Sequence, residues 1–504
     1  MTQYLLPEGL GLDAALDRLA GRWALGVGPV EVIERTFYDT FDGRLHRAGL
    51  ALIGAGGRLV AARGPGYHEV AAAPVIPGER LFAPELPDGS LRRLLEPIVE
   101  IRALGPIICT RGQVRGLRVL NRDAKTVVRL VLETASSGEE VVLRSRLRVI
   151  GVRGYDRALA RVERALAEDL GFAPSPVALH DDALRAAGRA PGGVSTKLAV
   201  KLAADDPARA GAAVVLVALL RTIELTLPGT VADIDSEFLH DLRVAVRRTR
   251  SIQRQLAGVF PAGRLARFRS EFRWLGQVTG PTRDLDVLLL DFARLRAELA
   301  DDRAAELAPL GDLLGARREL ERRRMVAALA GERTGSLLAG WSSFLTLAQA
   351  PDGGGADGAP LGAVVGQRIR ALYRQMRRAG VTIDEGTPAE RLHDLRKQGK
   401  ELRYLLEIFA GLYPAEAVAP TVKTLKALQE TLGQFQDREV QATTLRSLGD
   451  DLAQAAGGPA ALLALGVVLE RVEADSRAAR VEFDERFAAY AAPSQRALVR
   501  RAFR

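Results

Sequence analysis

The chain contains 504 residues, of which 47% are apolar and 26% charged, a composition typical of a soluble globular protein with two or three domains. Its single cysteine, Cys109, excludes an internal disulfide and a thiolate metal cluster. The formal net charge of +9 is consistent with a polyanionic partner, but charge alone does not distinguish a nucleic acid from a phosphate polymer.

The N-terminal sequence, MTQYLLPEGLG, lacks the basic region followed by an apolar region that defines a secretory signal. No apolar run approaches the ~20 residues that a membrane span needs. We therefore expect a cytoplasmic protein without a membrane partner.

Strand patterns predominate up to about residue 180, with turn residues between them. The predicted strands cover residues 29–38, 50–62 (two strands around Gly54–Gly57), 126–133 and 140–150, and the predicted helices cover 12–23 and 155–170. This order predicts an α+β domain built on an antiparallel sheet.

A glycine- and proline-rich segment, GRAPGG at residues 188–193, predicts a linker, after which Ala, Leu and Arg recur at helical spacing. Residues 203–348 predict five or six helices, and residues 361–504 predict a comparable set. The segment PDGGGADGAP, residues 351–360, is typical of neither helix nor strand. We therefore predict a first domain at 1–187, a linker at 188–193 and a helical domain at 194–504, with repeats at about 194–350 and 361–504.

The helical region contains an internal repeat. LHDLRVAVRRTRSIQRQLAGVF (239–260) and LHDLRKQGKELRYLLEIF (392–409) share their first five residues, and their basic positions stay in register at an offset of 153. In the first copy, the residues on one helical face are His240, Arg243, Arg247, Arg250 and Arg254. Apolar residues fill the adjoining arc: Leu239, Leu242, Val246, Ile252, Leu256 and Phe260.

Like charges at such spacing repel one another, so an anion is expected to offset them. The alternative is an ordinary solvated face with local acidic partners. Asp241 and Asp394 lie well around the helix from the basic arc, and only Glu407, which replaces Arg254 in the second copy, enters it. Duplication in register therefore favours a binding face over a solvated one.

A second landmark repeats as LGQ followed by acidic residues. Asp284 and Asp286 correspond to Asp437 and Glu439, and the first copy carries four extra residues around 279–281, which predict a turn insertion. These acids, with His240 and His393, could bind a metal, although the neighbouring positive charge disfavours a cation. They could instead begin a helix or pair with arginines. The repeated histidines could also be buried packing residues.

These doubled motifs resemble the CHAD domain, a helical domain named for its histidines and found mostly in bacteria, over about residues 194–504. The resemblance implies two four-helix bundles related by a pseudo-twofold axis, with basic helices lining a shared groove or pore that binds inorganic polyphosphate. Arginine suits this ligand because its guanidinium binds phosphate bidentately. The candidate binding residues are His240, Arg243, Arg247, Arg250, Arg254, Arg269, His393, Arg396, Lys400, Arg403 and Lys426, where Arg269 and Lys426 align once the LGQ segments are matched.

The first domain resembles a CYTH domain, the triphosphate tunnel fold, through FYDTFDGRLHRAGLALI at residues 37–53. Its chemistry departs from that family. The opening ExExK signature is missing, LRRR is replaced by Leu52-Ile53-Gly54-Ala55, and an acidic ExE strand is replaced by Arg146-Leu147-Arg148. Metal-assisted phosphoryl chemistry needs such carboxylates. We therefore expect a degenerate tunnel-like domain without catalytic residues, and we expect no metal or other cofactor.

The leading hypothesis is a non-enzymatic protein that binds inorganic polyphosphate, which would place it at polyphosphate granules. One alternative is a triphosphatase or polyphosphatase that acts through the tunnel-like domain. Another is a nucleic-acid-binding protein, which the low aromatic content of 5% and the absence of a recognisable reading helix disfavour.

Overall fold

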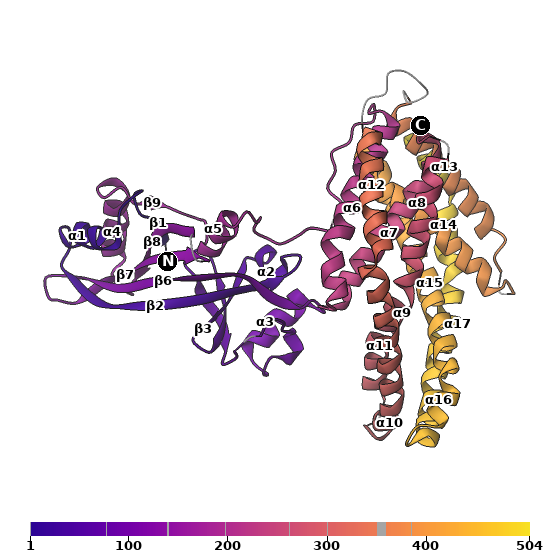
Figure 1. The fold of residues 1–504 in the computed structure, drawn as a ribbon, viewed down its shortest axis with the longest axis horizontal. Helices are drawn as coiled ribbons and strands as arrows, with labels where there is room; N and C mark the ends of the chain where they lie inside the picture. Colours follow the sequence, from indigo (N-terminus) through magenta and orange to yellow (C-terminus); the bar gives the residue numbers. More distant parts are fainter. Residues whose placement is uncertain are drawn as a thin grey trace. The chain divides into compact units, whose positions relative to one another are not determined.

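The computed structural model describes residues 2–503 except 77, 139–140, 197, 262, 300, 350–358 and 385. The chain forms two compact units, Met1–Thr196 and Lys197–Arg504 (Figure 1), which we describe separately. Most of the glycine-rich connection predicted at 351–360 lies outside the described residues.

The first unit contains a nine-stranded antiparallel sheet in the order β5-β4-β3-β2-β6-β7-β8-β1-β9. The strands are β1 (Thr2–Leu5), β2 (Leu25–Thr40), β3 (Leu50–Ala55), β4 (Arg58–Arg63), β5 (His68–Ala73), β6 (Leu104–Leu120), β7 (Thr126–Ser137), β8 (Val141–Gly151) and β9 (Ala173–Pro174). The predicted fold class, an antiparallel-sheet domain followed by a helical region, is confirmed.

Two apolar clusters hold helices against this sheet. Helices α1 (Leu12–Ala20) and α4 (Asp156–Glu168) share one cluster with β7 and β8, and α3 (Ser90–Val99) packs in the other with β3 to β5. The remaining helices of this unit are α2 (Arg44–Arg47) and α5 (Leu179–Ala186).

The segment predicted as a linker, 188–193, packs against the first unit. The Arg189 guanidinium donates to the carbonyl of Ile107, and the Val194 N–H donates to the carbonyl of Phe41 at 2.9 Å. Backbone and side-chain hydrogen bonds therefore hold this segment in place despite its glycine and proline content.

The described elements of the second unit are helices (Figure 1). Its helices are α6 (Ala208–Val231), α7 (Ser236–Gln255), α8 (Arg264–Val278), α9 (Gly280–Ala297), α10 (Asp301–Glu306), α11 (Ala308–Ala330), α12 (Glu332–Gln349), α13 (Leu361–Gly380), α14 (Ala389–Ile408), α15 (Ala415–Ser447), α16 (Gly449–Ala453), α17 (Gly458–Ala491) and α18 (Pro493–Ala502).

The repeat is visible in the helix boundaries. At the offset of 153, α7 coincides with α14 from first residue to last, and α6 begins where α13 does. Helices α8 and α9 together correspond to the uninterrupted α15. The four extra residues of the first copy supply about one helical turn, with an interruption only at Thr279, and do not form the expected turn insertion.

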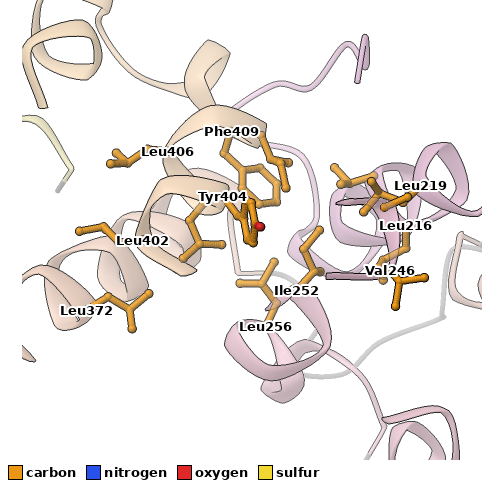
Figure 2. Packing of buried hydrophobic residues seen from close by; sticks show 14 of the residues in the cluster. Leu216, Leu219, Val246, Ile252, Leu256, Leu372, Leu402, Tyr404, Leu406 and Phe409 are labelled. Carbon is orange, nitrogen blue, oxygen red and sulfur yellow. The ribbon is translucent and has the colours of Figure 1, made fainter. Parts of the chain in front are cut away.

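A single large apolar cluster joins the two repeats. Figure 2 shows Ile252 of α7 and Leu256, which follows the helix, near Tyr404 of α14 and Phe409, with Leu216 and Leu219 of α6 at the right. All six apolar residues predicted to fill the arc of the first copy are buried. Their burial fixes the rotation of α7, and with it the direction of its basic face.

Helix α6 is the one described helix that is long and apolar enough to cross a membrane. Half of its apolar window is buried, with Ala212, Leu216 and Ile223 inside the shared cluster. The prediction that no apolar run approaches membrane-span length was wrong. Length and composition are weak evidence here, because a buried core helix meets the same criterion.

Candidate functional site

Helix α7 begins at a well-formed cap. The Asp235 carboxylate accepts hydrogen bonds from the backbone N–H groups of Glu237 and Phe238, at 2.9 and 3.2 Å. This satisfies two N–H groups that have no partner within the helix. With the cap at one end and the buried apolar arc along its length, α7 holds its basic face at a fixed angle.

We call the basic face of α7 together with that of α14 the basic cluster. Its members are Arg243, Arg247, Arg250 and Arg254 of α7 and Arg396, Lys400 and Arg403 of α14. All are partly buried except Arg254, which is exposed. The helices contact each other within the second unit, so the two predicted columns belong to one region.

Lys400 lies at the centre of this cluster. The pKa of its ammonium group is lowered to about 8, mainly by burial and also by the charges of Arg396 and Arg247. Because Arg247 belongs to the first repeat, its influence on Lys400 places cations from both copies close together. Asp437 of α15 acts in the opposite direction but does not compensate.

Arg243 shows the same excess of positive charge. Burial lowers its pKa to about 10, Arg247, Arg283 and Arg250 contribute in the same direction, and the Asp284 carboxylate opposes the shift. Its guanidinium donates to the carbonyl of Gly276 at 3.1 Å and to the Thr279 hydroxyl at 3.2 Å, which are neutral acceptors. The interruption between α8 and α9 thus positions Arg243 without neutralising it.

Two ion pairs link α7 to α14 beside these cations. Arg248 meets Glu407 at 3.3 Å, and Arg254 meets Glu401 at 2.6 Å. At the offset of 153, Arg248 corresponds to Glu401 and Arg254 to Glu407. The repeat therefore relates one ion pair to the other, and in both pairs the first copy supplies the arginine and the second copy the glutamate.

The repeated histidines make equivalent contacts with different partners. His240 Nδ1 lies 3.0 Å from Arg283 Nη2, and since a guanidinium only donates, this nitrogen accepts. His393 Nδ1 lies 2.7 Å from Oε1 of Gln436, the residue that corresponds to Arg283. Burial lowers the pKa of His393. Both histidines thus orient a side chain of the following helix segment.

The repeated acids do not begin a helix, contrary to one of the alternatives. Asp284 lies in the second turn of α9, and Asp437 lies within α15. Pairing with arginine is confirmed: Asp286 accepts from Arg318 at 2.8 Å, and Asp437 pairs with Arg396 at 2.9 Å. Among the described residues, no group of three or more His, Cys, Asp or Glu side chains could hold a metal ion.

The two residues predicted to extend the basic faces onto the neighbouring helices, Arg269 and Lys426, differ in their surroundings. Arg269 of α8 is exposed, and Lys426 of α15 lies 3.9 Å from Glu430 on its own helix. Arg273, one turn after Arg269, contributes to the lowered pKa of Arg250. The sequence did not point to Arg273, because the residue that aligns with it when the LGQ segments are matched is Glu430. The repeat therefore does not mark this position as basic.

The sheet of the first unit buries a second group of arginines. Arg35 is bonded to Glu133, and Arg148 lies 3.6 Å from the other oxygen of that carboxylate. Arg146 donates to Asp182 of α5 and, at 2.8 Å, to the carbonyl of Val177. Burial lowers the pKa of Arg148, while the Glu133 charge opposes the shift.

Helix α5 and the segment before it cover these arginines. His180 Nδ1 and the Tyr67 hydroxyl are 2.8 Å apart, and the His180 ring stacks on Phe37 at 5.0 Å between centroids. Burial raises the pKa of Tyr67 and lowers that of His180, so both groups are neutral near pH 7. The two arginines that replace the expected acidic strand are thus paired with carboxylates from β7 and α5.

Comparisons with known proteins bear on the helical unit. Residues 215–446 match the family model for the CHAD domain. Among solved structures, the crystal structure of the CHAD domain from the plant Ricinus communis is 24% identical, with a TM-score of 0.47, and the alignment covers 61% of this chain and 96% of that one. PptA from Streptomyces chartreusis is 17% identical, with a TM-score of 0.44 and coverage of 56% and 99%. No curated protein matches the chain. The N-terminal antiparallel sheet is compatible with a tunnel-like domain.

Proposed function

We propose, from the premise that residues 215–446 are a CHAD domain, that this chain binds inorganic polyphosphate through the basic cluster of α7 and α14. The family is associated with polyphosphate binding. The observation that carries the proposal is the gathering of cations from both repeats where α7 contacts α14, where burial and then neighbouring arginine charges lower the pKa of Lys400 and of Arg243. Burial and like charges both disfavour the charged forms of these groups, and a bound polyanion would offset both effects.

The cluster suits a phosphate polymer better than a nucleic acid. Arginine forks can each hold two oxygens of one phosphate, and a linear polymer presents phosphates at short, regular intervals. Tyr404, an aromatic side chain of α14, is buried, with the guanidinium of Arg248 on α7 5.8 Å from its ring. It is therefore not available for base stacking, which single-stranded nucleic acid binding commonly uses.

The alternative of a phosphatase in the first unit has no specific observation in its favour. Its buried carboxylates are both engaged within the fold: Glu133 pairs with Arg35 and Arg148, and Asp39 accepts hydrogen bonds from the backbone N–H groups of Thr40, Leu45 and His46. We propose that the protein acts as a binding protein located at polyphosphate granules in the cytoplasm. Phosphate release from tripolyphosphate with magnesium or manganese that disappears in Glu133→Gln would favour the phosphatase instead.

The test is a titration of the full chain with long-chain polyphosphate, and separately with RNA of equal charge, at several salt concentrations. We expect tighter binding to polyphosphate. Arg247→Glu/Arg250→Glu should weaken it about as much as Lys400→Glu/Arg403→Glu, and each lost phosphate contact should flatten the log–log salt slope by roughly 0.7 to 1. Combining both pairs should remove binding at moderate salt.

A matched control is Arg323→Glu/Arg324→Glu on α11, which changes the net charge equally. Both side chains are exposed and paired with Glu319 and Glu321. Affinity and salt slope should stay near those of the unmodified chain, with circular dichroism as the folding check. If the control double reversal weakens binding as much as the cluster reversals do, only net charge matters and the proposed site is wrong.

A further inference from the structure

Helices α13 and α18 are rich in arginine and contain no aspartate or glutamate. They meet where α18 ends: the Arg370 guanidinium of α13 donates to the carbonyl of Phe503, and a Cβ added to Gly366 would lie 2.6 Å from the same oxygen. We call their solvent-facing arginines the α13–α18 surface. Its members are Arg370, Arg374, Arg377 and Arg378 of α13 and Arg496 and Arg500 of α18.

The helical register gathers these arginines. At about 100° per residue, the four on α13 fall within an arc of roughly 100°, and the two on α18 are four residues apart and share one face. Side chains from both helices act on one buried tyrosine: burial raises the pKa of Tyr373, and the charges of Arg377 and Arg496 oppose the rise. The Nε of Arg377 is buried without a hydrogen-bond partner. The arginine faces of the two helices therefore adjoin.

The fold does not neutralise this surface. Among the residues that the structure describes, no carboxylate forms an ion pair with any of the six arginines. Acidic residues do lie on neighbouring segments. Glu482 of α17 pairs with Arg486 of its own helix at 2.5 Å, and Asp384, after α13, accepts a hydrogen bond within its own loop at 2.7 Å. Glu485 of α17 and Glu416 of α15 are exposed.

Packing of the helix does not demand arginines at these positions. Helices α6 and α13 begin at equivalent residues of the repeat, and both pack in the shared apolar cluster. At the offset of 153, α6 carries Val217, Arg221, Glu224 and Leu225 where α13 carries its four arginines. Like charges at this spacing weaken a helix, so an anion from outside the fold is expected to offset them.

This surface faces away from the basic cluster on its own helix. On the other side of α13, Arg368 donates to the side chain of Gln255, the last residue of α7, at 2.7 Å. Arg370 and Arg377 lie roughly 160–180° around the helix from Arg368. The side of α13 that meets α7 is thus not the side that carries the α13–α18 surface.

We propose that the α13–α18 surface is a second binding surface for phosphate polymer, so that one protein molecule holds two stretches of polyphosphate at once. This rests on the proposed function, because the basic cluster holds the other stretch. All six cations are arginines, each able to hold two oxygens of a phosphate. Both helices lie wholly within the described residues, and their exposed positions carry neither an aromatic ring for base stacking nor a large apolar side chain that could enter a bilayer.

Two charge reversals of the full chain test the surface: Arg374→Glu/Arg378→Glu and Arg496→Glu/Arg500→Glu. All four side chains are exposed, so both variants should fold, with circular dichroism as the check. Affinity for long-chain polyphosphate should fall about tenfold or more, because the second contact is lost. Affinity for tripolyphosphate, which is too short to span both surfaces, should stay near that of the unmodified protein.

Light scattering of mixtures with long-chain polyphosphate measures the bridging directly. The unmodified protein should link polymer chains into large particles, and both reversals should suppress them. The matched control is again Arg323→Glu/Arg324→Glu on α11, which changes the net charge equally and should keep both the particles and the affinity.

Long-chain affinity and scattering that both reversals leave unchanged, or that the control lowers equally, would overturn the second surface and leave the basic cluster intact. Stronger binding to vesicles of anionic phospholipid than to polyphosphate, lost in the same reversals, would also overturn it, because the surface would then recognise a membrane. The proposed function fails separately: tripolyphosphate affinity would then be unaffected by Lys400→Glu/Arg403→Glu.

Discussion

Both units of this protein bury arginines, but they neutralise them differently. In the first unit, Arg35, Arg146 and Arg148 are paired with Glu133 and Asp182, so each guanidinium has a carboxylate within the fold. In the basic cluster, Arg243 donates only to neutral groups and Lys400 is surrounded by cations. We infer that internal carboxylates balance the charge of the arginines in the first unit, whereas Arg243 and Lys400 stay available to an anion from solution.

The largest expected effect concerns the carboxylate that two buried arginines share. Glu133→Gln leaves Arg35 and Arg148 without a counter-charge, and breaking such a buried pair costs about 3–5 kcal/mol. We expect a loss of this size in the free energy of unfolding of the first unit, measured by denaturant titration. Polyphosphate affinity should stay unchanged wherever the protein is folded.

A conservative companion variant separates charge from packing. Glu133→Asp keeps the charge and removes one methylene group, so it should cost less than Glu133→Gln despite its smaller volume. If Glu133→Gln proves harmless, Arg35 and Arg148 do not depend on internal carboxylates, and the contrast between the two units disappears.

The sequence predicted the helical unit well because repetition supplied a second observation of each helix. The apolar arc from Leu239 to Phe260 is buried as predicted, and α7 and α14 coincide at the 153-residue offset. It could not show which acids approach the basic faces. Glu401 is far from Arg254 in the sequence, and only the crossing of α7 over α14 brings them within 2.6 Å.

The sheet was harder to predict, because its least regular strands have little hydrophobic pattern. Strand β6 lies in the middle of the sheet but carries exposed residues such as Cys109 and Arg111 beside several glycines, and β1 has four residues. The sequence showed that Arg146 and Arg148 replace an acidic strand motif. It could not show that Asp182 neutralises Arg146, since that contact depends on where α5 docks.

A smaller effect, of opposite sign for stability and binding, is expected at Lys400. Lys400→Met removes a partly buried cation among cations, so it should raise the free energy of unfolding by about 1 kcal/mol while weakening polyphosphate binding. Because the pKa of Lys400 is lowered from 10.5 to about 8, the unfolded chain binds more protons between these values, and the stability of the unmodified protein rises with pH there. The advantage of the variant should therefore be largest below pH 8 and shrink above it.

Denaturant titrations at pH 7 and pH 10 measure the gain in stability and its pH dependence, and a polyphosphate titration measures the affinity. Lys397→Met is the exposed control. A variant that loses stability and affinity together would mean that Lys400 is a structural contact. Cations would then be stabilised by the fold itself in both units, and the two units would not differ in this respect.

The smallest effect concerns the acids of the second repeat. Glu401 and Glu407 neutralise Arg254, Arg248 and Arg403, so they compete with any polyanion for those guanidinium groups. Glu401→Gln should therefore cost less than about 1 kcal/mol of stability, since Arg254 is half exposed, and should tighten polyphosphate binding by a few-fold. Glu321→Gln on α11 makes the same change in net charge beside Arg324 and should leave affinity unaltered.

In the first unit, removing a carboxylate damages the fold without affecting binding, whereas here it should improve binding at little cost to the fold. A Glu401→Gln protein that binds polyphosphate more weakly than the Glu321→Gln control would show that Arg254 must be held by Glu401 in order to contact the ligand. The second-repeat acids would then position the arginines, and the competition proposed here would be wrong.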